Sequence, residues 1–242
     1  MNFSQLILSA MAALVALTLH EFAHGFAAYK LGDDTAKEMG RLSLNPMKHL
    51  DIFGVICMIF FHFGWAKPVP INPMNFKNPK RGFAITALAG PMTNLILGFI
   101  TTFLYVLCLN SFKETSNGFL NTLEINVLLF LIYFFSINIG LGIFNLIPVP
   151  PFDGSRVLNV ILPDKWYFRV MKYERQIYLG VIAWLFLGHY VYIALISLPF
   201  VGNNAALSAI AKIFSLSDIL KDTISAITNG MIRMWSALPF FR

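Results

Sequence analysis

The sequence predicts an all-α polytopic membrane protein, and its composition and apolar pattern support this. Of its 242 residues, 57% are hydrophobic and only 12% are charged, whereas about a quarter of the residues in an average soluble domain are charged. Several apolar runs are long enough to cross about 30 Å of hydrocarbon as helices. We therefore expect about five to six transmembrane helices, with a short extended re-entrant or hairpin segment near residues 64–73.

The first part of the chain combines one clear span with irregular segments. Leu6–Ala28 is long enough to be a transmembrane helix. Glycine, asparagine and proline turn signals then predict an exposed loop over residues 30–51. Ile52–Phe63 is apolar but too short for an untilted crossing, so it predicts a short or re-entrant span. Three prolines between Pro68 and Pro73 exclude a helix there and favour extended backbone, which is either a lip beside a site or an ordinary loop.

The remaining spans are predicted over Gly82–Leu109, Ile125–Ile147 and Ile177–Val201. Beyond them, apolar residues repeat at helical spacing with charged residues between them, which is typical of amphipathic or interfacial helices. We therefore divide the chain into an integral-membrane core, residues 1–202, and a C-terminal region, residues 203–242. That region holds interfacial helices or a sixth span.

The distribution of positive charge predicts an orientation in the membrane. The net charge is +6, but the 18 Lys and Arg residues lie beside apolar segments, which indicates a lipid bilayer and no nucleic acid as partner. Residues 30–81 carry eight basic residues and residues 155–175 carry five, whereas the loop over residues 110–124 carries one. Because cytoplasmic loops are enriched in Lys and Arg, we expect a multi-pass cell-membrane protein whose site lies near the cytoplasmic side.

A His-Glu-x-x-His motif lies within the first predicted span. On a helix, His20 and His24 are one turn apart and can hold one zinc ion, while Glu21 lies beside the reacting water. Histidine and glutamate are costly inside a membrane and normally indicate function there. The alternative is a pair of core histidines beside an unrelated glutamate.

A second motif follows the predicted span that ends near Ile147. Prolines end that helix, and the Asp153-Gly154 turn can direct a carboxylate back toward the helices. Asp153 is therefore the best third metal ligand. Asp-Gly after prolines is also a common loop sequence, and His49, His62 and Asp51 are the next candidates.

Together these motifs resemble those of the site-2 protease family of intramembrane zinc metalloproteases. The resemblance covers about residues 6–156 and rests on four stretches: His20–His24, Gly64–Pro73, Gly90–Asn94 and Asn145–Gly154. Phe152 and Ser155 depart mildly from the family's aspartate motif. No stretch is long enough for the PDZ or CBS domains of many relatives, so the chain looks like a minimal member.

The resemblance implies one Zn²⁺ per chain, held by His20, His24 and Asp153, with Glu21 as general acid and base. It also implies that Asn94 helps to stabilise the reaction centre; the simpler interpretation of Asn94 is a hydrogen bond between helices. The expected function is hydrolysis of peptide bonds within or near transmembrane segments of membrane protein or peptide substrates. The alternative is a membrane metal-binding transporter or a catalytically silent binding protein with the same ligands, although a transporter needs no glutamate after the first histidine.

Overall fold

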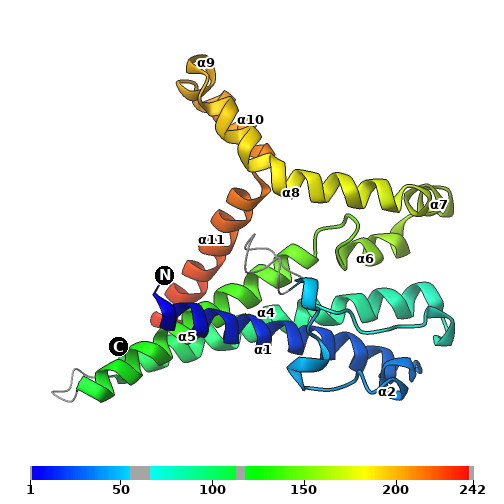
Figure 1. Cartoon of the computed structure of the whole chain (residues 1–242), viewed down its shortest axis with the longest axis horizontal. Coiled ribbons are helices and arrows are strands. Elements are labelled where there is room, and N and C mark those ends of the chain that lie inside the picture. The colour runs from blue at the N-terminus through cyan, green and yellow to red at the C-terminus, as the bar shows by residue number, and fades with distance from the viewer. Residues whose placement is uncertain (1, 55–65, 113–117, 240–242) are drawn as a thin grey trace.

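The computed structural model describes residues 2–54, 66–112 and 118–239, and most of them are helical (Figure 1). Within these ranges, β pairing is limited to one antiparallel bridge between Leu50 and Ala66. The predicted all-α class is therefore confirmed. The part of the 64–73 stretch that is described, from Ala66 to Asn72, contains no helix, as expected, and is called the extended segment below; residues 64 and 65 lie outside the described ranges.

Three long helices form the core: α1 (Phe3–Lys30), α4 (Pro79–Ser111) and α5 (Gly118–Asn145). They pack against one another and run in alternating directions along the long axis of the molecule (Figure 1). Each is long and apolar enough to cross a membrane. The helix starts follow from local sequence: Asn2 and Gln5 form a capping box at α1, and Asn78 caps α4 just before Pro79.

Several polar groups are buried inside the core, and many large apolar groups lie on its surface. Thr86, Asn94 and Asn138 are fully buried between the helices, whereas Ile96 and Leu6 are more than half exposed. Buried amides and hydroxyls join helices in a membrane, where apolar side chains can face lipid at no cost. The three core helices therefore have the surface of transmembrane segments.

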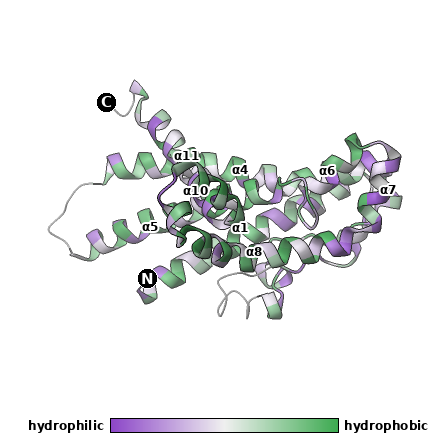
Figure 2. Ribbon diagram, turned by 90° about the horizontal axis from the view of Figure 1, so that it is seen from above, coloured by the Kyte–Doolittle hydropathy of each residue, from purple (hydrophilic) through white to green (hydrophobic). Residues whose placement is uncertain are grey.

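Shorter elements surround this core. Two of the later helices have clear places: α6 packs against α4, and α11 packs against both α4 and α5. Hydrophilic residues gather around α7, and hydrophobic residues cover much of α8 (Figure 2). The shorter and later elements are α2 (Thr35–Glu38), η1 (Pro46–Lys48), η2 (Pro73–Asn75), α6 (Gly154–Ile161), α7 (Asp164–Lys172), α8 (Glu174–Ile196), α9 (Pro199–Gly202), α10 (Ala205–Ala211), η3 (Lys212–Phe214) and α11 (Leu216–Ser236).

The described part of the chain has three candidate spans, or four if α8 is counted. Two parts of α8, Glu174–Leu185 and Leu187–Ile196, meet at a bend of 49°, and only together are they long and apolar enough to cross a membrane. Most of the Ile52–Phe63 stretch lies outside the described residues. The total of five to six spans stays a prediction.

Candidate metal centre and active site

Helix α1 places two histidines side by side near its C-terminal end. His20 and His24 are separated by one helical turn, and their ring centroids lie 4.6 Å apart. Their Nε2 atoms are 3.0 Å apart. Both side chains are buried. The predicted helical spacing therefore brings the two imidazoles to one point.

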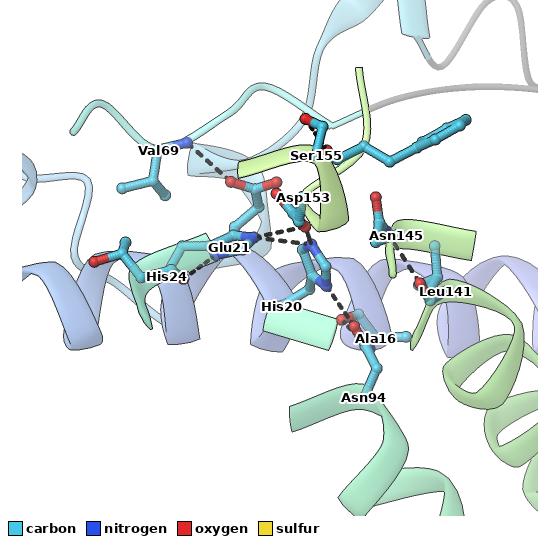
Figure 3. A network of polar contacts seen from close by, with 12 residues as sticks. Ala16, His20, Glu21, His24, Val69, Asn94, Leu141, Asn145, Asp153 and Ser155 are labelled. Atoms are coloured by element: carbon cyan, nitrogen blue, oxygen red, sulfur yellow. Dashed lines mark hydrogen bonds and ion pairs between the residues drawn. The ribbon is translucent and has the colours of Figure 1, made fainter. Parts of the chain in front are cut away.

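Asp153 reaches the same point from the segment between α5 and α6 (Figure 3). Its Oδ2 atom lies 3.2 Å from Nε2 of His20 and 3.2 Å from Nε2 of His24. Asp153 occupies the N-cap position of α6, but its side chain does not cap the helix. The preceding Phe152 is buried and packs on Phe144 of α5, with ring centroids 4.3 Å apart. The packing of Phe152 holds this segment in place, and the Asp153 carboxylate, which makes no cap hydrogen bond, is directed to the histidines.

Hydrogen bonds to α4 fix the orientation of both imidazole rings. Nδ1 of His24 donates to the Thr86 backbone oxygen at 2.7 Å, and Nδ1 of His20 donates to Oδ1 of Asn94 at 2.5 Å. The amide orientation of Asn94 is consistent, because its nitrogen faces two oxygens, those of Ala16 and Asn138. A neutral imidazole that donates from Nδ1 presents a lone pair at Nε2. Both Nε2 lone pairs therefore point to the side where Asp153 lies.

The resulting cluster is a set of three electron-rich atoms without donors between them. Oδ2 of Asp153 is buried and has no hydrogen-bond partner among the described residues, which is unfavourable unless a cation satisfies it. A tetrahedral zinc with ligand bonds of about 2.0–2.1 Å spaces its ligand atoms by roughly 3.3 Å. The observed separations of 3.0 to 3.2 Å fit this geometry. His20, His24 and Asp153 could together hold one metal ion.

Gly90 of α4 leaves the space in which the histidines meet. A Cβ atom at this position would lie 2.4 Å from Nε2 of His24 and 2.7 Å from Cε1 of His20. Such approaches are shorter than any ordinary carbon contact. Only glycine therefore fits here without displacing the imidazoles.

Glu21 lies beside the three-residue cluster, held by a different contact. Its Oε2 atom accepts a hydrogen bond from the backbone N–H of Val69 at 2.9 Å (Figure 3). Val69 belongs to the extended segment, so this segment passes directly over the motif on α1. The arrangement puts a carboxylate next to the cluster without adding it to the three candidate ligands.

The family model described as peptidase family M50 matches residues 8–188. The chain belongs to peptidase family M50. It is 40% identical over 211 residues to "Putative zinc metalloprotease YwhC" of Bacillus subtilis, covering 84% of this chain and 88% of that protein. It is also 29% identical over 167 residues to "Zinc metalloprotease MJ0392" of Methanocaldococcus jannaschii, covering 67% of this chain but only 37% of that protein. No solved structure matches the chain.

Membership of this family establishes the protein as a zinc metalloprotease. The donor set fits zinc, because imidazole nitrogen and carboxylate oxygen are common zinc ligands.

Sequence reasoning had also singled out Asn94. In the structure, both hydrogens of its amide are used, since the nitrogen lies 2.7 Å from Oδ1 of Asn138 and 3.3 Å from the Ala16 oxygen. Donation to a reacting carbonyl would require Asn94 to leave one of these acceptors.

The other residues considered as metal ligands do not join the cluster where the structure describes them. His49 is buried and its Nε2 donates to the Ser43 oxygen, while Asp51 accepts from the Gly54 N–H. His62 lies outside the described residues. Sequence reasoning missed Thr86 and Val69, which contribute only backbone atoms and so leave no signal in their side chains. Asn138 stands out in the sequence as an amide in an apolar run, but its pairing with Asn94 could not be predicted.

Proposed function

We propose that this zinc metalloprotease cleaves peptide bonds within or near the transmembrane segments of membrane proteins. The observation that supports this is the position of the cluster: His20 and His24 lie on a helix of membrane-spanning length, and Asp153 meets them at the end of a second one. In this proposal His20, His24 and Asp153 hold zinc. Glu21 is the general base and acid.

Each residue has a defined task in the hydrolysis. Bound zinc supplies a Lewis acid, which makes water a nucleophile near neutral pH and polarises a carbonyl. Glu21 removes a proton from water as oxygen bonds to the scissile carbonyl carbon. It then returns the proton to the leaving nitrogen as the C–N bond breaks. The products are one carboxylate end and one amine end. Thr86 and Asn94 hold the two imidazoles in place by accepting from their Nδ1 atoms.

The extended segment provides an edge for the substrate. A transmembrane helix hides its peptide bonds in internal hydrogen bonds, so it must unwind locally before it can be cut. Among the described residues, the N–H of Ile71 and the C=O groups of Val69 and Ile71 have no hydrogen-bond partner. Residues two apart in a strand direct these groups to the same side. We infer that the unwound substrate pairs here by β-addition, partially, because the prolines provide no donors.

The proposed location follows from the same helices. The connection of α1 to α4 and the stretch between α5 and α8 leave the core at one end. They carry five and four basic residues, whereas the connection of α4 to α5 carries one. This asymmetry supports a multi-pass protein whose site faces the cytoplasmic side. The proposed substrates are other membrane proteins that cross the same bilayer.

The deciding experiment compares two variants of the purified protein on single-span membrane substrates. We expect Glu21→Gln to abolish cleavage while the protein keeps about one zinc per chain, because glutamate acts on water and is not a ligand. Asp153→Ala should lose both zinc and cleavage, because two protein ligands form a weak site. Metal content is read by elemental analysis and cleavage by the mass of the fragments.

Glu38→Gln is the matched control, since Glu38 is exposed in α2, away from the cluster. It should retain both zinc and cleavage. If wild-type protein moves metal across vesicles and cuts no substrate, the transporter alternative replaces the proposal. Loss of zinc in Glu21→Gln would instead make Glu21 a ligand.

A further inference from the structure

The backbone N–H of Val69 is the only donor within the Pro68-Val69-Pro70 run, because proline has none. It donates to Oε2 of Glu21 at 2.9 Å. This contact joins a segment 48 residues away in the chain to the residue proposed as general base. A run of prolines thus presents one isolated donor, and that donor meets one oxygen of the carboxylate (Figure 3).

The packing of the Val69 side chain on α1 sets the distance between the Val69 amide and this helix. It is 6% exposed. A Cβ built on Gly25, one helical turn beyond Glu21, would lie 3.1 Å from Cγ1 of Val69. The absence of a side chain at Gly25 therefore lets Val69 pack closely on the helix. One residue makes both contacts, with its side chain toward Gly25 and its amide toward Glu21.

Four further hydrogen bonds hold the extended segment at both ends. Lys67 donates its N–H to the His49 oxygen at 2.8 Å. Arg41 donates to the oxygens of Lys67 and Pro68 at 2.9 and 3.2 Å. At the other end, the N–H of Asn72 donates to Oδ2 of the fully buried Asp33 at 2.8 Å. The Val69 amide therefore has a fixed position relative to α1.

We propose that the Val69 N–H is a positioning group for the general base. It holds Oε2 of Glu21, so that the carboxylate keeps one orientation and Oε1 is the oxygen available for the proton of water. A free glutamate side chain would sample several rotamers and a broad terminal torsion. The inference rests on the proposed role of Glu21. It assigns a catalytic effect to the extended segment in addition to any contact with substrate.

The first test needs neither metal nor activity. Hydrogen exchange of the Val69 amide is measured in wild type, Glu21→Gln and Glu21→Ala. The glutamine keeps a side-chain oxygen as acceptor, whereas alanine keeps none. We expect exchange about tenfold faster in Glu21→Ala than in the other two proteins, the effect of losing one hydrogen bond. Equal rates in all three would overturn the contact.

The second test separates the amide from the side chain. Val69→Pro removes the N–H, and Val69→Ala keeps it, while both lose the packing on Gly25. We expect kcat of Val69→Pro to be about ten- to a hundredfold below that of Val69→Ala, with similar KM and zinc content, because misplacing a reacting group by 1 Å costs this much. Equal kcat values, or a loss confined to KM, would overturn the proposal.

Two outcomes distinguish this inference from the proposed function. A wild-type protein that cuts no membrane substrate would refute the function, and the exchange comparison would still decide the contact. An active wild type with equal kcat in both Val69 variants would refute only the positioning role. If Val69→Pro does not fold, Arg41→Gln releases the segment without changing residue 69, and its kcat should also fall at constant zinc content.

Discussion

Both histidines use their second ring nitrogen to reach α4. His20 donates to the side chain of Asn94, and His24 donates to the backbone of Thr86. Asn94 is in turn held by Asn138 of α5, whose own nitrogen donates to the Phe134 oxygen at 2.8 Å. This chain of hydrogen bonds fixes the tautomer of His20 from a helix that offers no ligand. Partners of this kind typically change metal affinity by tenfold to a hundredfold.

Asn94→Ala separates the two roles that this residue can have. We expect zinc affinity to fall about ten- to a hundredfold, because His20 loses the acceptor that orients it. A chelator competition titration measures the affinity, and cleavage at saturating zinc measures turnover. Normal zinc affinity with a steep loss of turnover would contradict this and support the reaction-centre role implied by the resemblance, which is worth roughly 3 kcal/mol for one donor.

Gly90→Ala should remove zinc without unfolding the protein. The added methyl would lie 2.4 Å from Nε2 of His24, so the imidazole must leave the cluster. Zinc content after purification and helicity by circular dichroism are the two measurements. Gly180→Ala is the control, because a Cβ there meets nothing within 4 Å. Full zinc in Gly90→Ala would show that the histidines have another arrangement.

At this scale, the sequence predicted the three side chains that meet in the cluster. His20 and His24 were predictable because one helical turn brings them together, and Asp153 because its turn follows the end of a span. The space at Gly90 was not predictable, since glycine has the same sequence signal whether it lies in a turn or faces a metal site. The bond from Glu21 to Val69 depends on where the extended segment crosses α1, which tertiary packing decides.

Among the elements, the extended segment depends most on one buried carboxylate. Asp33 follows α1 and is fully buried. It accepts from the N–H and hydroxyl of Thr35, the N–H of Asn72 and the amide of Asn75. Burial acts to raise the pKa of Asp33, but these hydrogen bonds outweigh it and hold the pKa below 3.8. The ionised carboxylate therefore connects the end of α1 to the segment over the site.

Asp33→Ala should destabilise the protein by roughly 1–3 kcal/mol, since several buried donors lose a charged acceptor. The pKa of Asp33 is lower in the folded protein than its ordinary value of 3.8. The stabilisation by ionised Asp33 is therefore complete above pH 3.8, and it is lost as the pH falls through the pKa of the folded state. Thermal unfolding of wild type and variant is compared at neutral pH and below 3.8.

The difference in stability should shrink at the acidic pH. The exposed neighbour Asp34, whose side chain makes no cap bond at α2, provides the control substitution Asp34→Ala. A pH-independent difference, or an equal loss in Asp34→Ala, would contradict the role of Asp33. The proline pattern predicted that this segment is extended, but nothing in the sequence indicated that Asp33 would hold it.

For the whole molecule, the alternating directions of α1, α4 and α5 place the ends of the core on two faces. Apolar length predicted the bounds of α1 and α4 within three residues, whereas α5 begins at Gly118, seven residues before the predicted start at Ile125. The arrangement of α8 and the last helices was less predictable, because charged residues interrupt the apolar pattern of α11 and its packing on α4 and α5 is decided by tertiary contacts.

Single cysteines should report these two faces. After replacement of Cys57 and Cys108, Lys37→Cys and Lys165→Cys should react with an impermeant reagent from the cytoplasmic side only, and Ser111→Cys from the other side only. The reason is that three alternating crossings put the basic connections together. Reaction of positions 37 and 111 from the same side would contradict the alternating path.

The distance in sequence between the proposed ligands also sets when a newly made chain can acquire its metal. When α1 leaves the ribosome it offers two nitrogens, a weak site at best. The carboxylate of Asp153 is added 129 residues after His24 (153 minus 24), once α4 and α5 have been made. Insertion of the helices therefore comes first and metal loading last. With the ligand set proposed above, a partly synthesised chain lacks a complete zinc site and is no hydrolase.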